Sequence, residues 1–150
     1  MIKKFLSTDQ QSYALLAVRV ALGVVLLPHG MQKALGMFGC YGFSGTVGFF
    51  GQMGIPAIVA TLVIMAEFLG SAALILGFGT RFMAASIFVT MLGAMVMGGH
   101  LQNGFFMNWF GNQAGEGVEF FILVFGLAIA SLVGGSGRFS IDNLISKRLK

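Results

Sequence analysis

The stretch AIVATLVIMAEFLGSAALIL, residues 57–76, contains a single charged side chain, Glu67, near its middle. A helix of about 20 predominantly apolar residues is long enough to cross the hydrocarbon core of a bilayer. A charged group at mid-depth costs about 2.5–3.5 kcal/mol on insertion scales, so its presence there needs a partner or a role. We therefore predict that residues 57–76 span a membrane and that Glu67 faces other protein segments.

The rest of the chain has the same apolar character. Of its 150 residues, 57% are hydrophobic and only 9% are charged, whereas a soluble domain carries about 25% charged residues. This composition excludes an ordinary soluble enzyme and a disordered chain. Three further apolar segments of spanning length are predicted at 14–35, 82–98 and 118–133. The predicted fold is all-α, a four-helix transmembrane bundle that forms one membrane domain over residues 1–150.

Two connecting segments are predicted to be short helices at the membrane surface. Glycine recurs at every third position in GCYGFSGTVGFFGQMG, residues 39–54, which favours an interfacial or re-entrant helix between the first two spans. In the tail, residues 140–150, Ile141, Leu144 and Ile145 fall on one helical face beside basic residues. This amphipathic pattern indicates an interfacial helix.

The distribution of lysine and arginine predicts the orientation. With four spans, both termini and the turn around Arg81 lie on one side of the membrane, and that side carries nearly all the basic residues. The positive-inside rule then places both termini on the cytoplasmic side of the membrane. The expected location is a bacterial inner membrane. The net charge of +4 matches anionic lipid. Because the basic residues do not alternate with aromatic ones, nucleic acid is not an expected partner.

Each predicted span has one face on which polar and small residues coincide, and we expect these faces to point inward. In chain order the four faces are Arg19, Gly23, Leu26, Gly30 and Lys33; Ala60, Glu67, Ser71 and Leu74; Ser86, Thr90, Gly93, Met97 and His100; and Glu116, Glu119, Leu123, Gly126 and Ala130.

Depth along the helices predicts which of these groups meet. At 1.5 Å rise per residue, Arg19 and His29 lie within reach of Glu67 from opposite directions. A second polar group is expected near the outer mouth, comprising Lys33, His100, Glu116 and Glu119. The hypothesis is a polar core running from Glu67 to that mouth. A purely structural alternative stays open, in which Arg19–Glu67 fixes the helix register and Lys33–Glu119 is a salt bridge at the rim.

Metal and disulfide chemistry are not predicted. The two histidines, His29 and His100, are widely separated, and neither shares a helix face with a second ligand at metal-binding spacing. Cys40 is the only cysteine, so the chain cannot form an internal disulfide.

Over residues 15–144 the sequence resembles the DoxX family of small four-helix membrane proteins. Ser71 stands where a further glycine is common in that family. The residues that carry the resemblance are RVALG (19–23), HGMQK (29–33), GQMGIP (51–56), EFLG (67–70), LGFGTR (76–81), GEGVE (115–119) and GSGRFSID (135–142).

The resemblance implies a role in membrane redox chemistry. Some family members look like the membrane subunit of a thiosulfate:quinone oxidoreductase, and others associate with redox-stress enzymes. By this resemblance Glu67, Arg19 and His29 would be the catalytic residues, with Glu67 as proton acceptor and the cations holding the developing quinol oxygen. Quinone is then the expected cofactor, and a soluble redox enzyme the expected electron donor. The candidate substrate-binding residues are Lys33, Ser71, His100 and Glu119.

Two other functions stay open at this stage. The same charges could form the pathway of a carrier or exporter for a small anion or phenolic compound, in which case four spans favour a homodimer. Alternatively, the chain could be a non-catalytic membrane scaffold.

Overall fold

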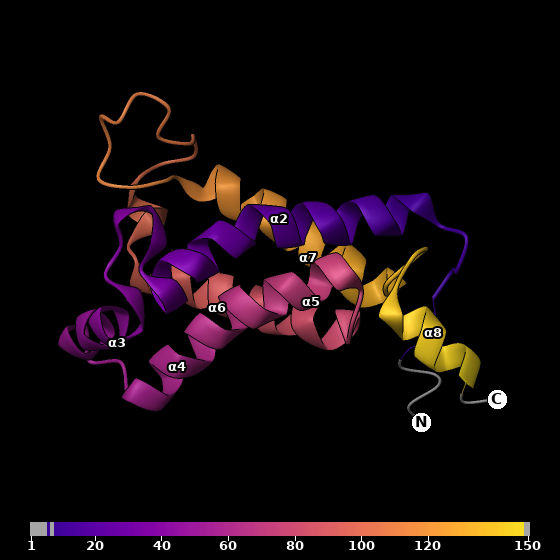
Figure 1. Ribbon diagram of the computed structural model, residues 1–150. Coiled ribbons are helices and arrows are strands. Elements are labelled where there is room, and N and C mark those ends of the chain that lie inside the picture. The colour runs from indigo at the N-terminus through magenta and orange to yellow at the C-terminus, as the bar shows by residue number, and fades with distance from the viewer. Residues whose placement is uncertain (1–5, 7, 149–150) are drawn as a thin grey trace.

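The computed structural model describes residue 6 and residues 8–148, and the regular elements within that part of the chain are helical. Two short 3₁₀ turns, η1 (Met37–Gly39) and η3 (His100–Gln102), lie in the connections. The helices are α2 (Tyr13–Leu35), α3 (Gly42–Gln52), α4 (Ala57–Met65), the π-helical turn η2 (Ala66–Gly70), α5 (Ser71–Leu76), α6 (Thr80–Met97), α7 (Val118–Gly134) and α8 (Ile141–Arg148) (Figure 1).

Three of these helices are long and apolar enough to cross a membrane. They are α2 with 23 residues, the continuous helix α4–η2–α5 with 20 residues, and α6 with 18 residues. Helix α7 is also apolar but has 17 residues. The ends predicted for all four segments lie within two residues of the observed ends. The all-helical prediction and the presence of a small apolar bundle are therefore confirmed.

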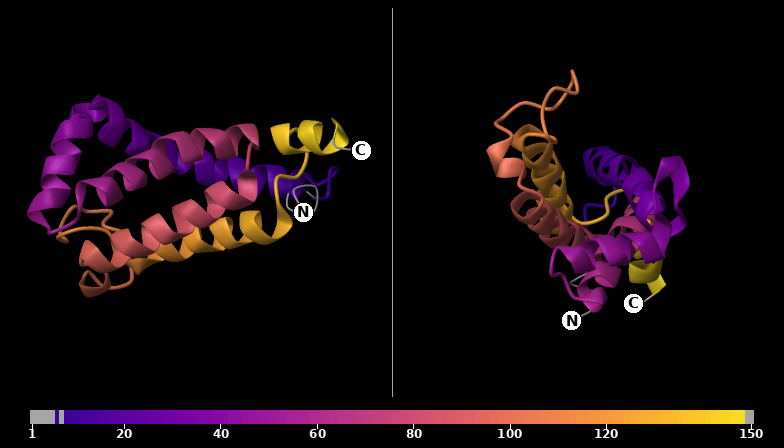
Figure 2. Two further views of the ribbon diagram at one scale, coloured as in Figure 1. Left: turned by 90° about the horizontal axis from the view of Figure 1, so that it is seen from below. Right: turned by 90° about the vertical axis from the view of Figure 1, so that its left-hand side faces the viewer.

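The two connecting helices also form where the sequence predicts them. Helix α3 occupies the glycine-rich connection, and α8 occupies the tail, of which residues 149 and 150 lie outside the described part. Their position relative to a membrane surface stays a prediction. Helix α8, the start of α2 and the α5–α6 turn lie at one end of the bundle, called here the α8 end; α3 and residues 98–117 lie at the opposite end, called the loop end (Figures 1 and 2).

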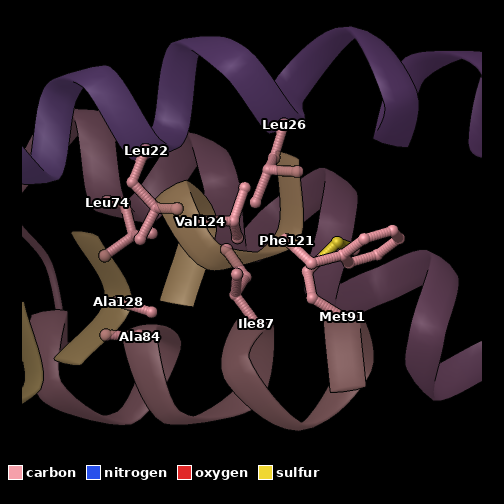
Figure 3. Close-up of a cluster of buried hydrophobic side chains, with 9 residues drawn as sticks. All are labelled: Leu22, Leu26, Leu74, Ala84, Ile87, Met91, Phe121, Val124 and Ala128. Atoms are coloured by element: carbon pink, nitrogen blue, oxygen red, sulfur yellow. The ribbon is translucent and has the colours of Figure 1, made fainter. Parts of the chain in front are cut away.

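A cluster of buried apolar side chains fills the middle of the bundle. It is built by α2, α5, α6 and α7, which all contribute side chains to the same layer (Figure 3). Within a bilayer, close van der Waals packing of such side chains helps to hold the four helices together. Its members are Leu22, Leu26, Leu74, Ala84, Ile87, Met91, Phe121, Val124 and Ala128.

Two glycines let α2 approach the helix α4–η2–α5 very closely. A Cβ atom added at Gly30 would lie 2.5 Å from the backbone N and Cα of Phe68, and one added at Gly23 would lie 2.7 Å from the carbonyl oxygen of Ser71. Such backbone-to-backbone contact is possible only without a side chain. The predicted inward faces of the first two spans are confirmed, because their apolar, small and charged members are buried, with Lys33 partly so.

Helix α7 presents a different face to the bundle from the one predicted. Phe121, Val124 and Ala128 are buried, whereas Leu123 and Gly126 point outward. The prediction of an inward Glu116–Ala130 face is wrong, because Glu119 lies in the first turn of the helix and its carboxylate bonds to a loop. That polar residue therefore does not constrain which side of the rest of the helix packs on the core.

At the α8 end, Asp142 ties three elements together. Its carboxylate accepts hydrogen bonds from the backbone N of Gly79 (2.7 Å) and of Thr80 (3.0 Å), and its own N–H donates to the carbonyl oxygen of Gly77 (2.9 Å). Gly79, at the N-cap position of α6, has no side chain to cap that helix. A carboxylate from α8 therefore takes the place of a local N-cap, and it fixes α8 against the α5–α6 turn.

Candidate functional site

A large, mostly apolar cavity of about 1260 Å³ lies between the α2–α4 and α6–α7 sides of the bundle and extends along α6 from Phe82 to Met97. Several lining residues on α4 and α6, including Leu62, Phe82 and Val89, are themselves exposed on the molecular surface. The cavity therefore opens sideways between α4 and α6, which lie on different sides of the bundle (Figure 2). Its polar and charged lining residues are His29, Lys33, Glu67, Ser86, Thr90, His100 and Glu116.

The charged centre of this cavity is an ion pair between α2 and the π-helical turn. Lys33 Nζ lies 2.5 Å from Oε2 of Glu67, and the Glu67 side chain is 2% exposed whereas that of Lys33 is 25% exposed. A buried carboxylate is tolerated in apolar surroundings when a cation neutralises it. Lys33 and Glu67 thus form a compact, partly accessible pair of opposite charges in an otherwise apolar wall.

Local backbone geometry brings these two side chains together. Gly30 lies one helical turn before Lys33 and contacts the backbone of Phe68 directly, so α2 and η2 are in their closest contact beside the pair. Glu67 belongs to a π-helical turn, a local widening of the helix that occurs frequently at functional sites. The glycine and the widened turn together place the ammonium against the carboxylate.

The structure does not pair Arg19 with Glu67. Arg19 is fully buried at the α8 end, where its guanidinium donates five hydrogen bonds to backbone carbonyls. The predicted Arg19–Glu67 contact is wrong because the last turn of α5 and the chain after α7 offer uncapped carbonyls nearby, which a guanidinium satisfies well. The acceptors are the carbonyl oxygens of Leu74 (2.8 Å), Ile75 (2.5 Å), Ser136 (2.7 Å), Arg138 (3.2 Å) and Phe139 (2.7 Å).

The remaining candidates divide between the cavity and its surroundings. His29 and His100 line the cavity, whereas Ser71 is fully buried beside Gly23 and Glu119 lies outside the lining. The predicted Lys33–Glu119 salt bridge is wrong: Lys33 binds Glu67, and Oε2 of Glu119 accepts a hydrogen bond from the backbone N of Met107 at 3.1 Å. Arg19, Ser71 and Glu119 therefore do not face the cavity.

The acidic residues near the loop end organise the long connection after α6. Oε2 of Glu116 accepts a hydrogen bond from the backbone N of Asn108 at 2.7 Å, and Nδ1 of His100 lies 2.7 Å from the Glu116 carbonyl oxygen. Asn108 also bonds to the backbone of Gln113 in both directions. These contacts fold the loop over one edge of the cavity.

One feature of the cavity was not predicted from the sequence. Phe49 and Phe50 of α3 line it, although the sequence predicts only an interfacial or re-entrant helix there and assigns no residue of that helix to a site. The buried side of α6 is formed by Thr80, Ala84, Ile87 and Met91, so the predicted inward face of the third span does not pack on the core. Its residues Ser86, Thr90, Gly93, Met97 and His100 line the open cavity instead. Within residue 6 and residues 8–148, no three His, Cys, Asp or Glu side chains are grouped closely enough to hold a metal ion.

Comparison with known proteins identifies the family. The model of the DoxX family matches residues 14–100, which include α2, both halves of the kinked second helix, α6 and every charged group of the cavity except Glu116. The chain belongs to the DoxX family. The matched segment therefore contains the Lys33–Glu67 pair and the glycines that position it.

Two relatives of this DoxX-family chain are similar over different lengths. The Escherichia coli protein named Inner membrane protein YqjF is 27% identical over 146 residues, covering 92% of this chain and 96% of that protein. The Bacillus subtilis protein named Putative oxidoreductase CatD is 31% identical over 81 residues, covering 54% of this chain and 56% of that protein. No solved structure matches the chain.

Proposed function

We propose that this DoxX-family chain is a multi-pass inner membrane protein with four spans and that it forms the quinone-binding subunit of a membrane oxidoreductase. The observation that carries the proposal is the Lys33–Glu67 ion pair in the wall of a large apolar cavity that opens sideways. The names of the two relatives, one an inner membrane protein and the other an oxidoreductase, support the location and the class of reaction.

The shape and lining of the cavity suit a molecule with a polar head and an apolar tail. Apolar side chains from α4 and α6 flank the lateral opening, and the ion pair lies on α2 and η2. A quinone dissolved in the hydrocarbon core would enter between α4 and α6, with its head toward Lys33 and its tail toward the opening. Binding pockets of this kind combine a mostly apolar lining with a few well-placed polar groups.

The chemistry required of the residues is charge stabilisation and proton transfer. Two-electron reduction of a quinone to a quinol consumes two protons, and the electrons come from a separate soluble redox enzyme that carries its own cofactor. The Lys33 ammonium and the His29 imidazole stabilise negative charge on the quinone oxygen. This electrostatic stabilisation is stronger in a site of low dielectric constant than in water. The carboxylate of Glu67, held 2.5 Å from Lys33, takes up one of the two protons and passes it to that oxygen, which regenerates the carboxylate of the ion pair. The second proton reaches the other quinone oxygen from water.

A binding titration tests this proposal. The protein is placed in lipid nanodiscs and titrated with a short-chain ubiquinone, using quenching of Trp109, the single tryptophan, which lines a smaller cavity beside the site. We expect the double variant Lys33→Met/Glu67→Gln to bind at least about tenfold more weakly, or about 1.4 kcal/mol. Both residues are changed together because removing one alone would leave an unpaired buried charge.

The matched control removes the same two charges elsewhere. Asp9 and Lys147 are exposed residues at the α8 end, so Asp9→Asn/Lys147→Met should bind quinone as the native protein does. If the cavity variant binds quinone with native affinity while the control also does, the ion pair has no role in quinone binding and the proposal is wrong.

A further inference from the structure

A second, smaller cavity of about 210 Å³ adjoins the large one beneath the loop at residues 103–117. It is lined by Met107, Asn108 and Trp109 of the loop together with three residues that also line the large cavity. The shared residues are His29, Glu116 and Phe120. The wall between the two cavities is therefore formed by an imidazole, a carboxylate and an aromatic ring.

His29 is the group in this wall that is suited to passing protons. It lies on α2 one turn before Lys33, with its ring centroid 6.4 Å from that of Phe120. An imidazole has two ring nitrogens, so it can accept a proton at one and release a proton from the other. Because His29 borders both cavities, these two events can occur on opposite sides of the wall.

Glu116 supplies the outer end of the route. It is exposed, and the backbone N of Asn108 holds its Oε2 at 2.7 Å beside the smaller cavity. The titratable and charged groups that share a cavity with His29 are Lys33 on the same helix, Glu67 on η2, His100 on η3 and Glu116 before α7. The exposed carboxylate of Glu116 and the imidazole of His29 therefore line the same cavity as the buried ion pair, with Lys33 one turn nearer the loop end than His29.

Apolar side chains pack the middle of the bundle on the α8 side of the ion pair. They include Leu22, Leu74, Ile87 and Val124, each no more than 2% exposed (Figure 3). Beyond them the guanidinium of Arg19 is fully buried and bound to five carbonyls. The buried polar side chains on that side are the hydroxyls of Ser71, Thr80 and Ser131. Among the described residues no carboxylate or imidazole lies between Glu67 and Arg19, so no group that titrates near neutral pH continues the route toward the α8 end.

We propose that the Lys33–Glu67 pair exchanges protons with the loop end of the molecule through His29, and not with the α8 end. A proton from the aqueous phase at Glu116 binds one ring nitrogen of His29, and the other nitrogen releases a proton toward Glu67 in the large cavity. The use of these protons for quinone reduction rests on the proposed function, whereas the route itself does not.

The test measures the protonation of His29 against the pH on each side of a membrane. The full chain is reconstituted in uniformly oriented vesicles, and solid-state NMR records the ¹⁵N signals of histidine. His29→Gln provides the difference spectrum that separates His29 from His100, the other histidine. We expect the His29 signal to change when only the compartment at the loop end is titrated from about pH 8 to about pH 5, the interval in which histidine usually titrates. The signal should stay constant when only the compartment at the α8 end is titrated.

A His29 signal that follows the α8-end compartment, or that responds to neither compartment, would overturn the route. The quinone titration described above is run on the same vesicles. If the native protein binds no quinone but His29 responds as expected, the proposed function alone is rejected. If the native protein binds quinone but His29 gives the wrong response, the route alone is rejected.

Discussion

Arg19→Lys is expected to remove most of the folded protein from the membrane fraction. Lysine has three donors in place of five and cannot hold the planar arrangement that reaches carbonyls on α5 and on the chain after α7. At least two buried carbonyls lose their partner, at about 1–3 kcal/mol each. The loss of about 2–6 kcal/mol is a large part of a typical stability of about 5–15 kcal/mol. The measurement is the thermal midpoint in detergent together with the yield of monodisperse protein.

The matched control is the same substitution at Arg138. This guanidinium is partly exposed and lies over the rings of Tyr13 (4.7 Å) and Phe139 (4.9 Å). Arg138→Lys keeps a cation over the rings and should change the midpoint only slightly. Native stability in Arg19→Lys would contradict the role assigned to Arg19 as the group that satisfies the helix ends.

Gly30→Ala is expected to separate α2 from η2 and to weaken quinone binding although the residue carries no polar group. The new Cβ would lie 2.5 Å from the backbone N and Cα of Phe68, atoms that cannot move independently of their helix. Overpacking of this kind costs about 1–3 kcal/mol. It also pulls Lys33 away from Glu67, so we expect at least about a tenfold loss of quinone affinity.

Gly126→Ala is the control for adding a methyl group to a helical glycine. Nothing lies within 4 Å of a Cβ built at Gly126, so this variant should be as stable as the native protein or slightly more stable. Both variants are compared by thermal midpoint and by the quinone titration. Undiminished quinone binding in Gly30→Ala would show that the contact between α2 and η2 does not position the ion pair.

The helices were predictable because the membrane leaves few alternatives for apolar segments of this length. Only a helix satisfies its own backbone within hydrocarbon, and the charged residues mark the ends. The inward faces of α2 and α4–η2–α5 followed from Gly23, Gly30 and Glu67, which have a strong reason to avoid lipid. On α7 such a residue is Ser131, which is fully buried, whereas the prediction used Glu119 at the helix start.

Which residues line the site was more predictable from the sequence than which of them form an ion pair. His29, Lys33, Glu67 and His100 line one cavity, as their helix faces and depths indicated. Partner choice depends on which carbonyls are left uncapped at the α8 end and on how closely Gly30 lets two helices approach. Both are properties of the packed structure and not of any one helix, so the sequence alone did not distinguish Arg19–Glu67 from Lys33–Glu67.

The most direct test of the account is a distance measurement between Lys33 and Glu67 in a lipid bilayer. Dipolar coupling between ¹⁵N at Lys33 Nζ and ¹³C at the Glu67 carboxyl, recorded by solid-state NMR, reports whether the two groups are in contact. We predict the strong coupling of an ion pair with the 2.5 Å N–O separation found here, and its loss in Gly30→Ala. A Glu67 carboxyl coupled to the Arg19 guanidinium, or to no cation, would contradict the site and the function built on it.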